Sequence, residues 1–380
     1  MQKGKFLLIA FISVALIMAL SFSVVYFLGD SKSTLYTEET SSAKQEEDMI
    51  KDMIEDMTVE EKISQMIMLT CHDEVNIEEI LPNSVGGICL FGHSFEGKTE
   101  AQVIDMISLY NSLSKTPMIV SVDEEGGSVN RVSTNENLRA APFWSPSQLY
   151  SQGGFELIKS DTEEKCDLLK KLGINVNLAP VCDVPLSEDN YIYDRCFSLD
   201  YDETSQYVEN VVKIMKEKQV GSTLKHFPGY GGSVDTHESV SYDQRKYEDF
   251  ENGDFKPFIS GINEGADCVM VSHNIVTCMD DENPASLSKP VHDILRDTLK
   301  FDGVILTDDL KMGAVTKFTD KADSYKLALK AGNDMISCED YYGAKEAMLS
   351  CVESKEVVIK QIDESVYRIL KLKMDLGIIK

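Results

Sequence analysis

Short apolar runs alternate with amphipathic stretches along most of the chain. Runs of strand length occur at Met66–Thr70, Gly86–Phe91, Met118–Asp123, Asn175–Val181, Gly221–His226, Cys268–His273, Val304–Asp308 and Asp334–Cys338. Between most of them the apolar residues recur with a helical period, as in Glu203–Glu217 and Phe250–Glu264. Buried parallel strands have continuous apolar runs, and helices connect them. Eight such units predict an α/β fold, a closed (β/α)8 barrel of the TIM type. A doubly wound open sheet is the alternative, but no GxGxxG motif follows an early strand.

The N-terminus has a different pattern. Phe6 to Leu28 is an uncharged apolar run that follows Lys3 and Lys5. It reaches the length of roughly 20 residues that a membrane-spanning helix needs, and the preceding lysines orient the N-terminus inside. We therefore expect a transmembrane anchor over residues 1–29, a polar stalk over 30–48 and a single barrel domain over 49–380. A signal peptide cleaved near Ala19-Leu20-Ser21, followed by secretion, is the alternative. Either way the barrel lies outside the cytoplasm.

The net charge argues against one class of partner, and the cysteine pattern argues against disulfide bonds. The chain has 37 basic and 64 acidic residues and a formal net charge of -27, so its surface repels nucleic acid. Its nine cysteines include no CxxC pair, and several lie in apolar runs. We expect buried free thiols rather than a disulfide framework.

Titratable residues stand at the ends of several predicted strands. In a barrel of this type the active site lies at the carboxyl ends of the strands. A single polar residue there is an ordinary strand end, but several together predict a site: Asp123, Asp183, Lys225, His226, His273 and Asp308. For His273 a supporting role and a purely structural role are equally compatible with the pattern.

The segment from Lys225 to His237 combines turn-forming residues with proton-transfer groups. Pro228 and three glycines interrupt regular structure, and His237 follows Asp235 by two residues. Histidine suits general acid/base catalysis near neutrality, and a nearby carboxylate orients its ring. Asp308 ends a buried run, where a carboxylate can attack an electrophilic carbon, as in retaining glycoside hydrolysis. Sugar hydroxyls would be held by Asp123, Arg131, Arg195, Lys225 and His226.

The remaining candidates have weaker patterns. His72, His93 and His292 have no supporting context, and we expect surface or packing roles for them. Asp309 follows Asp308 directly, so strand alternation predicts that it points to the opposite side. Trp144, the sole tryptophan, is expected to pack rather than to stack on sugar.

These motifs resemble glycoside hydrolase family 3, and in particular its β-N-acetylglucosaminidase (β-hexosaminidase) branch. The resemblance rests on segments in family order from residue 57 onward: Glu60–Met66, Gly86–Phe91, Val122–Gly127, Leu178–Val184, Lys225–Gly231 with Asp235–His237, Pro284–Ser288 and Phe301–Met312. It implies that Asp308 is the nucleophile and His237 the acid/base, with Asp235 as its partner. It also implies that Asp123, Arg131, Arg195, Lys225 and His226 bind the sugar.

The chain departs from the family pattern at a few positions. Ser128 stands where the family usually has Arg, Tyr230 replaces a common His, and the span between Gly231 and Asp235 is short. About seventy residues follow Asp308, room for the last strand and closing helices but not for a second domain that would supply a Glu acid/base. This favours the N-acetylglucosaminidase branch over a β-glucosidase.

We therefore expect a retaining exo-β-N-acetylglucosaminidase that removes terminal β-linked GlcNAc from peptidoglycan-type fragments (muropeptides) through a covalent glycosyl-Asp intermediate. We expect no metal or cofactor, no nucleic-acid partner, and a monomer held at the cell membrane. The alternatives are an exo-β-glucosidase or β-xylosidase of the same family, transfer to phosphate in place of water, and a non-catalytic wall-glycan-binding protein on the same fold.

Overall fold

The structure is a computed structural model that describes residues 44–72, 75–231 and 240–379. The chain divides into two compact units, residues 1–55 and 56–380. In the first unit residues 44–55 are helical, so the described part of the segment predicted as a stalk, residues 44–48, is helical. The predicted anchor over residues 1–29 lies outside the described residues. Within the described ranges, no helix has the length and apolar character needed to cross a membrane.

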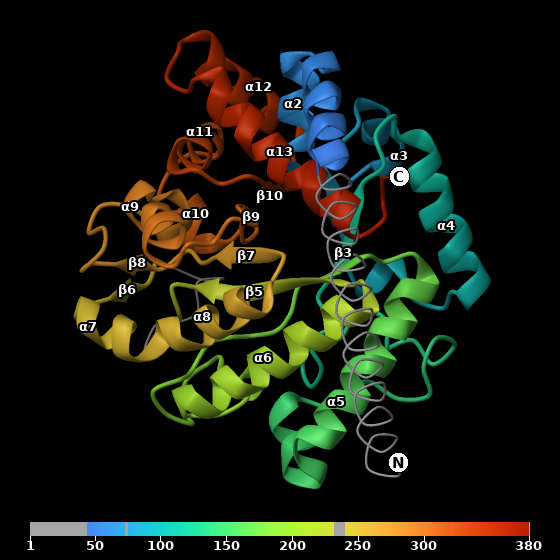
Figure 1. The fold of residues 1–380 in the computed structure, drawn as a ribbon, viewed down its shortest axis with the longest axis vertical. Helices are drawn as coiled ribbons and strands as arrows, with labels where there is room; N and C mark the ends of the chain where they lie inside the picture. The colour runs from blue at the N-terminus through green and yellow to red at the C-terminus, as the bar shows by residue number, and fades with distance from the viewer. Residues whose placement is uncertain (1–43, 73–74, 232–239, 380) are drawn as a thin grey trace, which may run out of the picture. The chain divides into compact units, whose positions relative to one another are not determined.

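The second unit is built around a parallel eight-stranded sheet in the order β10-β1-β2-β3-β4-β5-β7-β9. Helices surround this sheet in Figure 1. An isolated parallel bridge between Leu306 and Met335 joins the two edge strands, so the sheet closes into a barrel. Each predicted run overlaps one strand, and the predicted barrel is confirmed. The strands are β1 Ile67–Cys71, β2 Gly87–Leu90, β3 Ile119–Val122, β4 Val176–Asn177, β5 Gly221–Phe227, β7 Cys268–Val271, β9 Val304–Thr307 and β10 Ile336–Cys338.

A second, two-stranded parallel sheet was not predicted. It pairs β6 (Tyr242–Asp243), which precedes β7 in the chain, with β8 (Ile275–Val276), which follows β7. These strands have only two residues each, too short for a hydrophobic period to identify them.

Helices connect the barrel strands. The first, α2, begins with a capping box in which Thr58 and Glu61 bond each other's backbone N–H groups. The α-helices are α2 Val59–Gln65, α3 Ile77–Ile80, α4 Glu100–Leu113, α5 Pro146–Leu172, α6 Tyr201–Lys218, α7 Tyr247–Asp249, α8 Phe255–Glu264, α9 Lys289–Asp293, α10 Gly313–Thr316, α11 Lys321–Ala331, α12 Tyr341–Glu353 and α13 Ile359–Asp375. Short 3-10 helices are η1 Leu81–Asn83, η2 Gly92–Ser94, η3 Tyr193–Arg195 and η5 Ala285–Leu287, and π-helical turns are η4 Phe250–Asp254 and η6 Ile294–Thr298.

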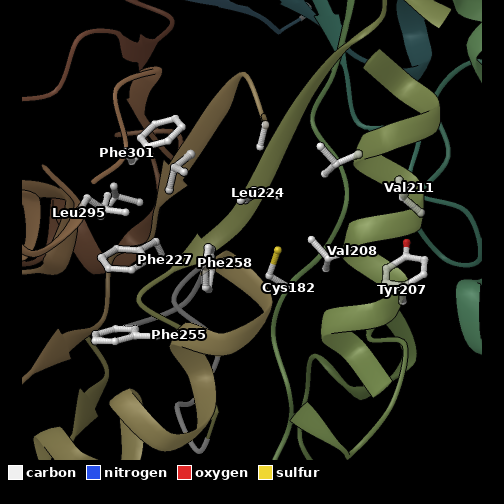
Figure 2. Packing of buried hydrophobic residues seen from close by; sticks show 14 of the residues in the cluster. Cys182, Tyr207, Val208, Val211, Leu224, Phe227, Phe255, Phe258, Leu295 and Phe301 are labelled. Atoms are coloured by element: carbon white, nitrogen blue, oxygen red, sulfur yellow. The ribbon is translucent and has the colours of Figure 1, made fainter. Parts of the chain in front are cut away.

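The hydrophobic core holds β5 in place between α6 and α8 (Figure 2). The Phe227 ring stacks on Phe255 with centroids 5.6 Å apart and meets Phe258 edge-on at 5.2 Å. Leu224 is fully buried, and a Cβ on Gly261 would lie 2.6 Å from it, so α8 approaches β5 closely only because Gly261 has no side chain. Each such burial contributes roughly 1.5–3 kcal/mol. The packing therefore fixes the strand that carries Lys225 and His226.

The cysteines agree with the expectation of free thiols. All nine are free, and all except Cys278 are buried. Burial raises the pKa of the Cys71 thiol to about 12, so this thiol stays protonated and unreactive near neutrality.

Candidate active site

A cavity of about 340 Å³ opens at the carboxyl ends of the barrel strands. Side chains of the strands themselves line it, among them Met68, Cys89, Met270 and Ser337, so the cavity is a blind pocket over the barrel core. Six of the predicted site residues also line it: Asp123, Arg131, Arg195, Lys225, His226 and Asp308. The other two predicted residues, Asp235 and His237, lie outside the described residues.

Lys225 forms the buried cationic centre of the pocket. Its Nζ lies 2.7 Å from Asp123 Oδ1 and 2.5 Å from Glu125 Oε1, and only 2% of its side chain is exposed. Burial lowers the pKa of Lys225, but the two carboxylates outweigh burial and raise it above its ordinary value. The ammonium group therefore stays charged and is held between β5 and the end of β3.

Glu125 links Lys225 to Arg195 and was missed as a site residue. Arg195, at the end of η3, donates from Nε to Glu125 Oε2 at 3.0 Å and from Nη2 to Oε1 at 2.8 Å. Burial raises the pKa of Glu125, but Arg195 and Lys225 together hold it well below the ordinary range. The pair is a bidentate fork, the strong geometry for a guanidinium and a carboxylate. The network is thus ionised and ordered before any ligand arrives.

Asp183 fixes the orientation of the His226 ring. Its Oδ2 lies 2.7 Å from His226 Nδ1 and accepts from the His226 backbone N–H at 3.1 Å, while Oδ1 accepts from the Tyr230 N–H at 2.8 Å. Arg195 Nη2 lies 3.2 Å from His226 Nε2. A neutral imidazole that donates from Nδ1 to Asp183 accepts at Nε2 from Arg195. Asp183 stands at a predicted strand end, but its role as the partner of His226 was not predicted.

Asp308 lies half-buried directly after β9. Its N–H donates to the Val271 carbonyl at 3.1 Å, and its Oδ1 accepts from the Asp309 N–H at 2.8 Å. Burial raises the pKa of Asp308, but attraction to the rings of His273 and His226 outweighs it, so the pKa lies below its ordinary value. The carboxylate is therefore ionised at neutral pH, the form that a nucleophile requires.

The structure corrects two predictions, for Asp309 and His72. Strand β9 ends at Thr307, so alternation does not extend to Asp309, which lines the pocket beside Asp308. His72 Nε2 lies 2.9 Å from Asp309 Oδ2, and the His72 ring stacks on Phe91 with centroids 4.5 Å apart. His72 is thus a pocket residue, not an ordinary surface residue. Its position just past the end of an apolar run was the signal that could have revealed it.

Arg131 is placed at the pocket by a buried carboxylate. Glu124 accepts from the backbone N–H groups of Arg131 at 2.8 Å, Val132 at 2.7 Å and Ser133 at 3.1 Å. The buried Nε of Arg131 has no hydrogen-bond partner within the described part of the chain. A buried donor without a partner costs free energy, so this N–H is available to a ligand.

Three other residues behave as supporting or packing groups. Buried His273 lies 2.7 Å from Ser286 Oγ through Nδ1 and 3.0 Å from the Asp309 carbonyl through Nε2, and so supports the turn after Asp308. His292 is buried against Ser288, as a packing residue should be. Trp144 is 52% exposed and is absent from the pocket lining, so the expected packing role is wrong.

Within residues 44–72, 75–231 and 240–379, no group of three His, Cys, Asp or Glu side chains is arranged to hold a metal ion.

Known proteins are similar to this chain in sequence and in fold. Residues 58–372 match the glycosyl hydrolase family 3 N-terminal domain. A β-hexosaminidase of Hydrogenovibrio crunogenus is 30% identical over 276 residues, which cover 71% of this chain and 76% of the relative. A β-hexosaminidase of Idiomarina loihiensis is 33% identical over 278 residues, which cover 70% of this chain and 80% of the relative.

Solved structures share the fold of this chain. A family 3 β-N-acetylglucosaminidase from Paenibacillus sp. superposes with a TM-score of 0.79 at 29% identity, over 85% of this chain and 63% of that longer chain. The β-glucoside phosphorylase BglX superposes at 0.78 with 20% identity, over 88% of this chain and 61% of the other, a likeness of fold alone. The chain therefore belongs to glycosyl hydrolase family 3 and is a glycoside hydrolase.

Proposed function

We propose that the protein is a retaining exo-β-N-acetylglucosaminidase that removes terminal β-linked GlcNAc from peptidoglycan-type fragments. The observation that carries the proposal is the ionised carboxylate of Asp308 at a blind pocket lined by Lys225, Asp123 and Arg195. The relatives named β-hexosaminidase and the neighbour named β-N-acetylglucosaminidase support the choice of sugar. The choice of wall fragments rests on the export predicted from the N-terminus.

The shape of the pocket supports action at a chain end. Lys225 and Glu125 are almost completely buried, and strand side chains close the cavity below them. A blind pocket of about 340 Å³ is near the lower limit of typical ligand sites. It suits one terminal sugar, whereas an internal unit of a glycan requires a groove that is open at both ends.

The proposed reaction has two displacements. Asp308 attacks the anomeric carbon and forms a glycosyl ester while the glycosidic C–O bond breaks, and His237 gives its proton to the departing oxygen. His237 then takes a proton from water, which attacks the same carbon and releases Asp308 as a carboxylate. Asp235 would stabilise the imidazolium form. The charged network of the pocket holds the sugar hydroxyls by directed hydrogen bonds.

The nucleophile assignment is tested with a chromogenic β-GlcNAc glycoside and the variants Asp308→Ala and Asp308→Asn. We expect the rate to fall by at least about a thousandfold in both, since each lacks an ionised nucleophile. Asp309→Asn is the matched control, because it removes the neighbouring carboxylate of the same pocket; we expect a smaller loss. Full activity of Asp308→Ala would remove Asp308 from the mechanism.

The sugar and acceptor are tested separately. A panel of aryl β-GlcNAc, β-glucoside and β-xyloside substrates, with and without inorganic phosphate, should show a clear preference for GlcNAc and no need for phosphate. Release of GlcNAc from a GlcNAc–MurNAc disaccharide is the corresponding test for wall fragments. A preference for glucoside would overturn the proposed sugar.

We also propose that the protein is held at the cell membrane with its barrel on the outer side. The apolar run Phe6–Leu28 after two lysines supports this arrangement. Fractionation should find the full chain in membranes and a chain without residues 1–29 in the soluble fraction. Equal solubility of the two would contradict the anchor.

A further inference from the structure

We propose that Arg245, with Asp243 and Asp254, is a positioning cluster that ties together the two ends of the segment delivering the catalytic proton. The inference rests on the proposed function, in which the acid/base belongs to the segment between Gly231 and β6. The cluster itself consists entirely of described residues, and none of its three members lines the pocket.

The guanidinium of Arg245 binds two buried carboxylates at once. Toward Asp243, Nη2 and Nε donate to Oδ2 at 2.8 and 3.0 Å. Toward Asp254, Nη1 donates to Oδ2 at 2.7 Å and Nη2 donates to Oδ1 at 3.1 Å. Its carbon centre lies 4.3 Å from the centroid of the Phe250 ring. Such a planar fork is specific to arginine, because a lysine ammonium cannot satisfy two carboxylates bidentately.

The same cluster contacts the entrance of the segment. Gly229 and Gly231 have φ values of +120° and +36°, which favour glycine. A methyl group on Gly231 would overlap the Arg245 guanidinium, and one on Gly229 would overlap the Asp254 carboxylate. The chain that leaves β5 therefore runs directly against the ion cluster.

The cluster also belongs to the exit of the segment. Asp243 is the second residue of β6, and its carbonyl accepts from the Thr277 N–H at 3.0 Å. The Asp243 carboxylate also accepts from the Arg245 backbone N–H at 3.0 Å. The guanidinium that is bonded to the chain after the segment thus packs directly against the backbone of the chain before it, and β6 is paired in turn with β8.

Stability alone does not account for this arrangement. Burial raises the pKa of Asp254 to about 6, although the Arg245 charge lowers it, so the ionised carboxylate is held at a cost in free energy. Buried ion pairs often contribute no net stability compared with apolar residues of similar volume. What the cluster supplies is a defined geometry for two chain segments that flank the proton donor. A displacement of about 1 Å in a reacting group can lower a rate about 100-fold.

The experiment compares kcat/KM of full-length variants on two substrates that differ in their need for an acid. The 2,4-dinitrophenyl β-GlcNAc glycoside has a leaving group that departs without a proton, whereas N,N′-diacetylchitobiose needs one. Arg245→Met should lose about 10- to 100-fold more on chitobiose than on the activated substrate. His237→Ala should show the same bias more strongly. Arg245→Lys should retain the bias, because it keeps the charge but not the fork.

The matched control is Arg139→Met. Arg139 also pairs with a carboxylate, Glu164, at 2.9 Å and lies 3.9 Å from an aromatic centroid, that of Phe143, but it is absent from the pocket lining. We expect equal changes of kcat/KM on both substrates for this variant. Gly231→Ala, which displaces the guanidinium without removing it, should reproduce the Arg245→Met bias.

The outcomes separate the inference from the function on which it rests. An equal loss on both substrates in Arg245→Met and Gly231→Ala would refute the positioning role. An equal loss of kcat/KM on both substrates in His237→Ala would instead refute His237 as the acid. In that case the substrate bias of the Arg245 variants would still show whether the cluster positions the proton donor. Misfolding is distinguished by the activated substrate, because an unfolded fraction lowers kcat/KM equally on both substrates and so produces no substrate bias.

Discussion

Lys373 offers a quantitative test of how the barrel is packed. This lysine of α13 has no exposed surface, and its Nζ lies 2.7 Å from the neutral amide oxygen of Gln65. Burial lowers its pKa from 10.5 to about 7, and among the described residues no charged group offsets the effect. One pKa unit corresponds to about 1.36 kcal/mol, so the charged form is destabilised in the folded protein by on the order of 5 kcal/mol.

The pH dependence follows from the direction of this pKa change. Below pH 7 Lys373 is protonated in both the folded and the unfolded protein. Between about pH 7 and 10.5 the unfolded chain binds a proton that the folded protein lacks, so the free energy of unfolding rises with pH. Lys373→Met should therefore be more stable than the wild type near pH 6, and this advantage should shrink by roughly 2 kcal/mol between pH 7 and 9.

The assay is urea unfolding of the variant and the wild type at several pH values between 6 and 9; the ionisation of the cysteine thiols is common to both proteins and cancels in the difference. Lys62→Met is the matched control, because Lys62 is largely buried on the same side of the barrel but is paired with Asp363 at 2.7 Å. Its stability difference from the wild type should be nearly constant over this pH range. A constant difference for Lys373→Met as well would refute the argument, since it would mean that Lys373 keeps its ordinary pKa.

Two further predictions concern the pocket. Glu125→Gln leaves the cations of Arg195 and Lys225 without their shared carboxylate. We therefore expect the free energy of unfolding, measured by urea titration, to fall by about 3–5 kcal/mol. A loss below about 1 kcal/mol would contradict the buried network. His72→Ala should raise KM for an aryl β-GlcNAc glycoside several-fold with less effect on kcat, whereas Trp144→Ala, a change of an exposed residue outside the pocket, should alter neither. A kcat effect of His72→Ala larger than its KM effect would refute the binding role.

The barrel could be predicted from the sequence because its strands are buried on both faces. The run Val304–Asp308, for example, is continuous and apolar, and it contains β9. Because both faces of such a strand are buried, its residues are apolar throughout, whichever elements pack against it. The small sheet of β6 and β8 could not be predicted, because strands of two residues are defined by a neighbouring backbone and not by their own composition.

The partners within the site could not be predicted for a related reason. Lys225 and Asp123 are 102 residues apart in the sequence, and Arg195 and Glu125 are 70 residues apart. Sequence spacing conveys nothing about contacts over such distances. The error for Asp309 arose differently: strand alternation was applied two residues beyond the end of the strand at Thr307.

The sequence by itself determined the eight strands, the strand ends where titratable residues gather, and the motif order that resembles family 3. Local pattern is enough for these features, because burial and turn chemistry act residue by residue. Only the tertiary structure decided which charges pair, that His72 and Glu125 belong to the pocket, and that Lys373 is buried with no counter-charge in the described part of the chain. Barrel closure brings distant strands together, and the protonation state of a buried group depends on every charge that closure places beside it.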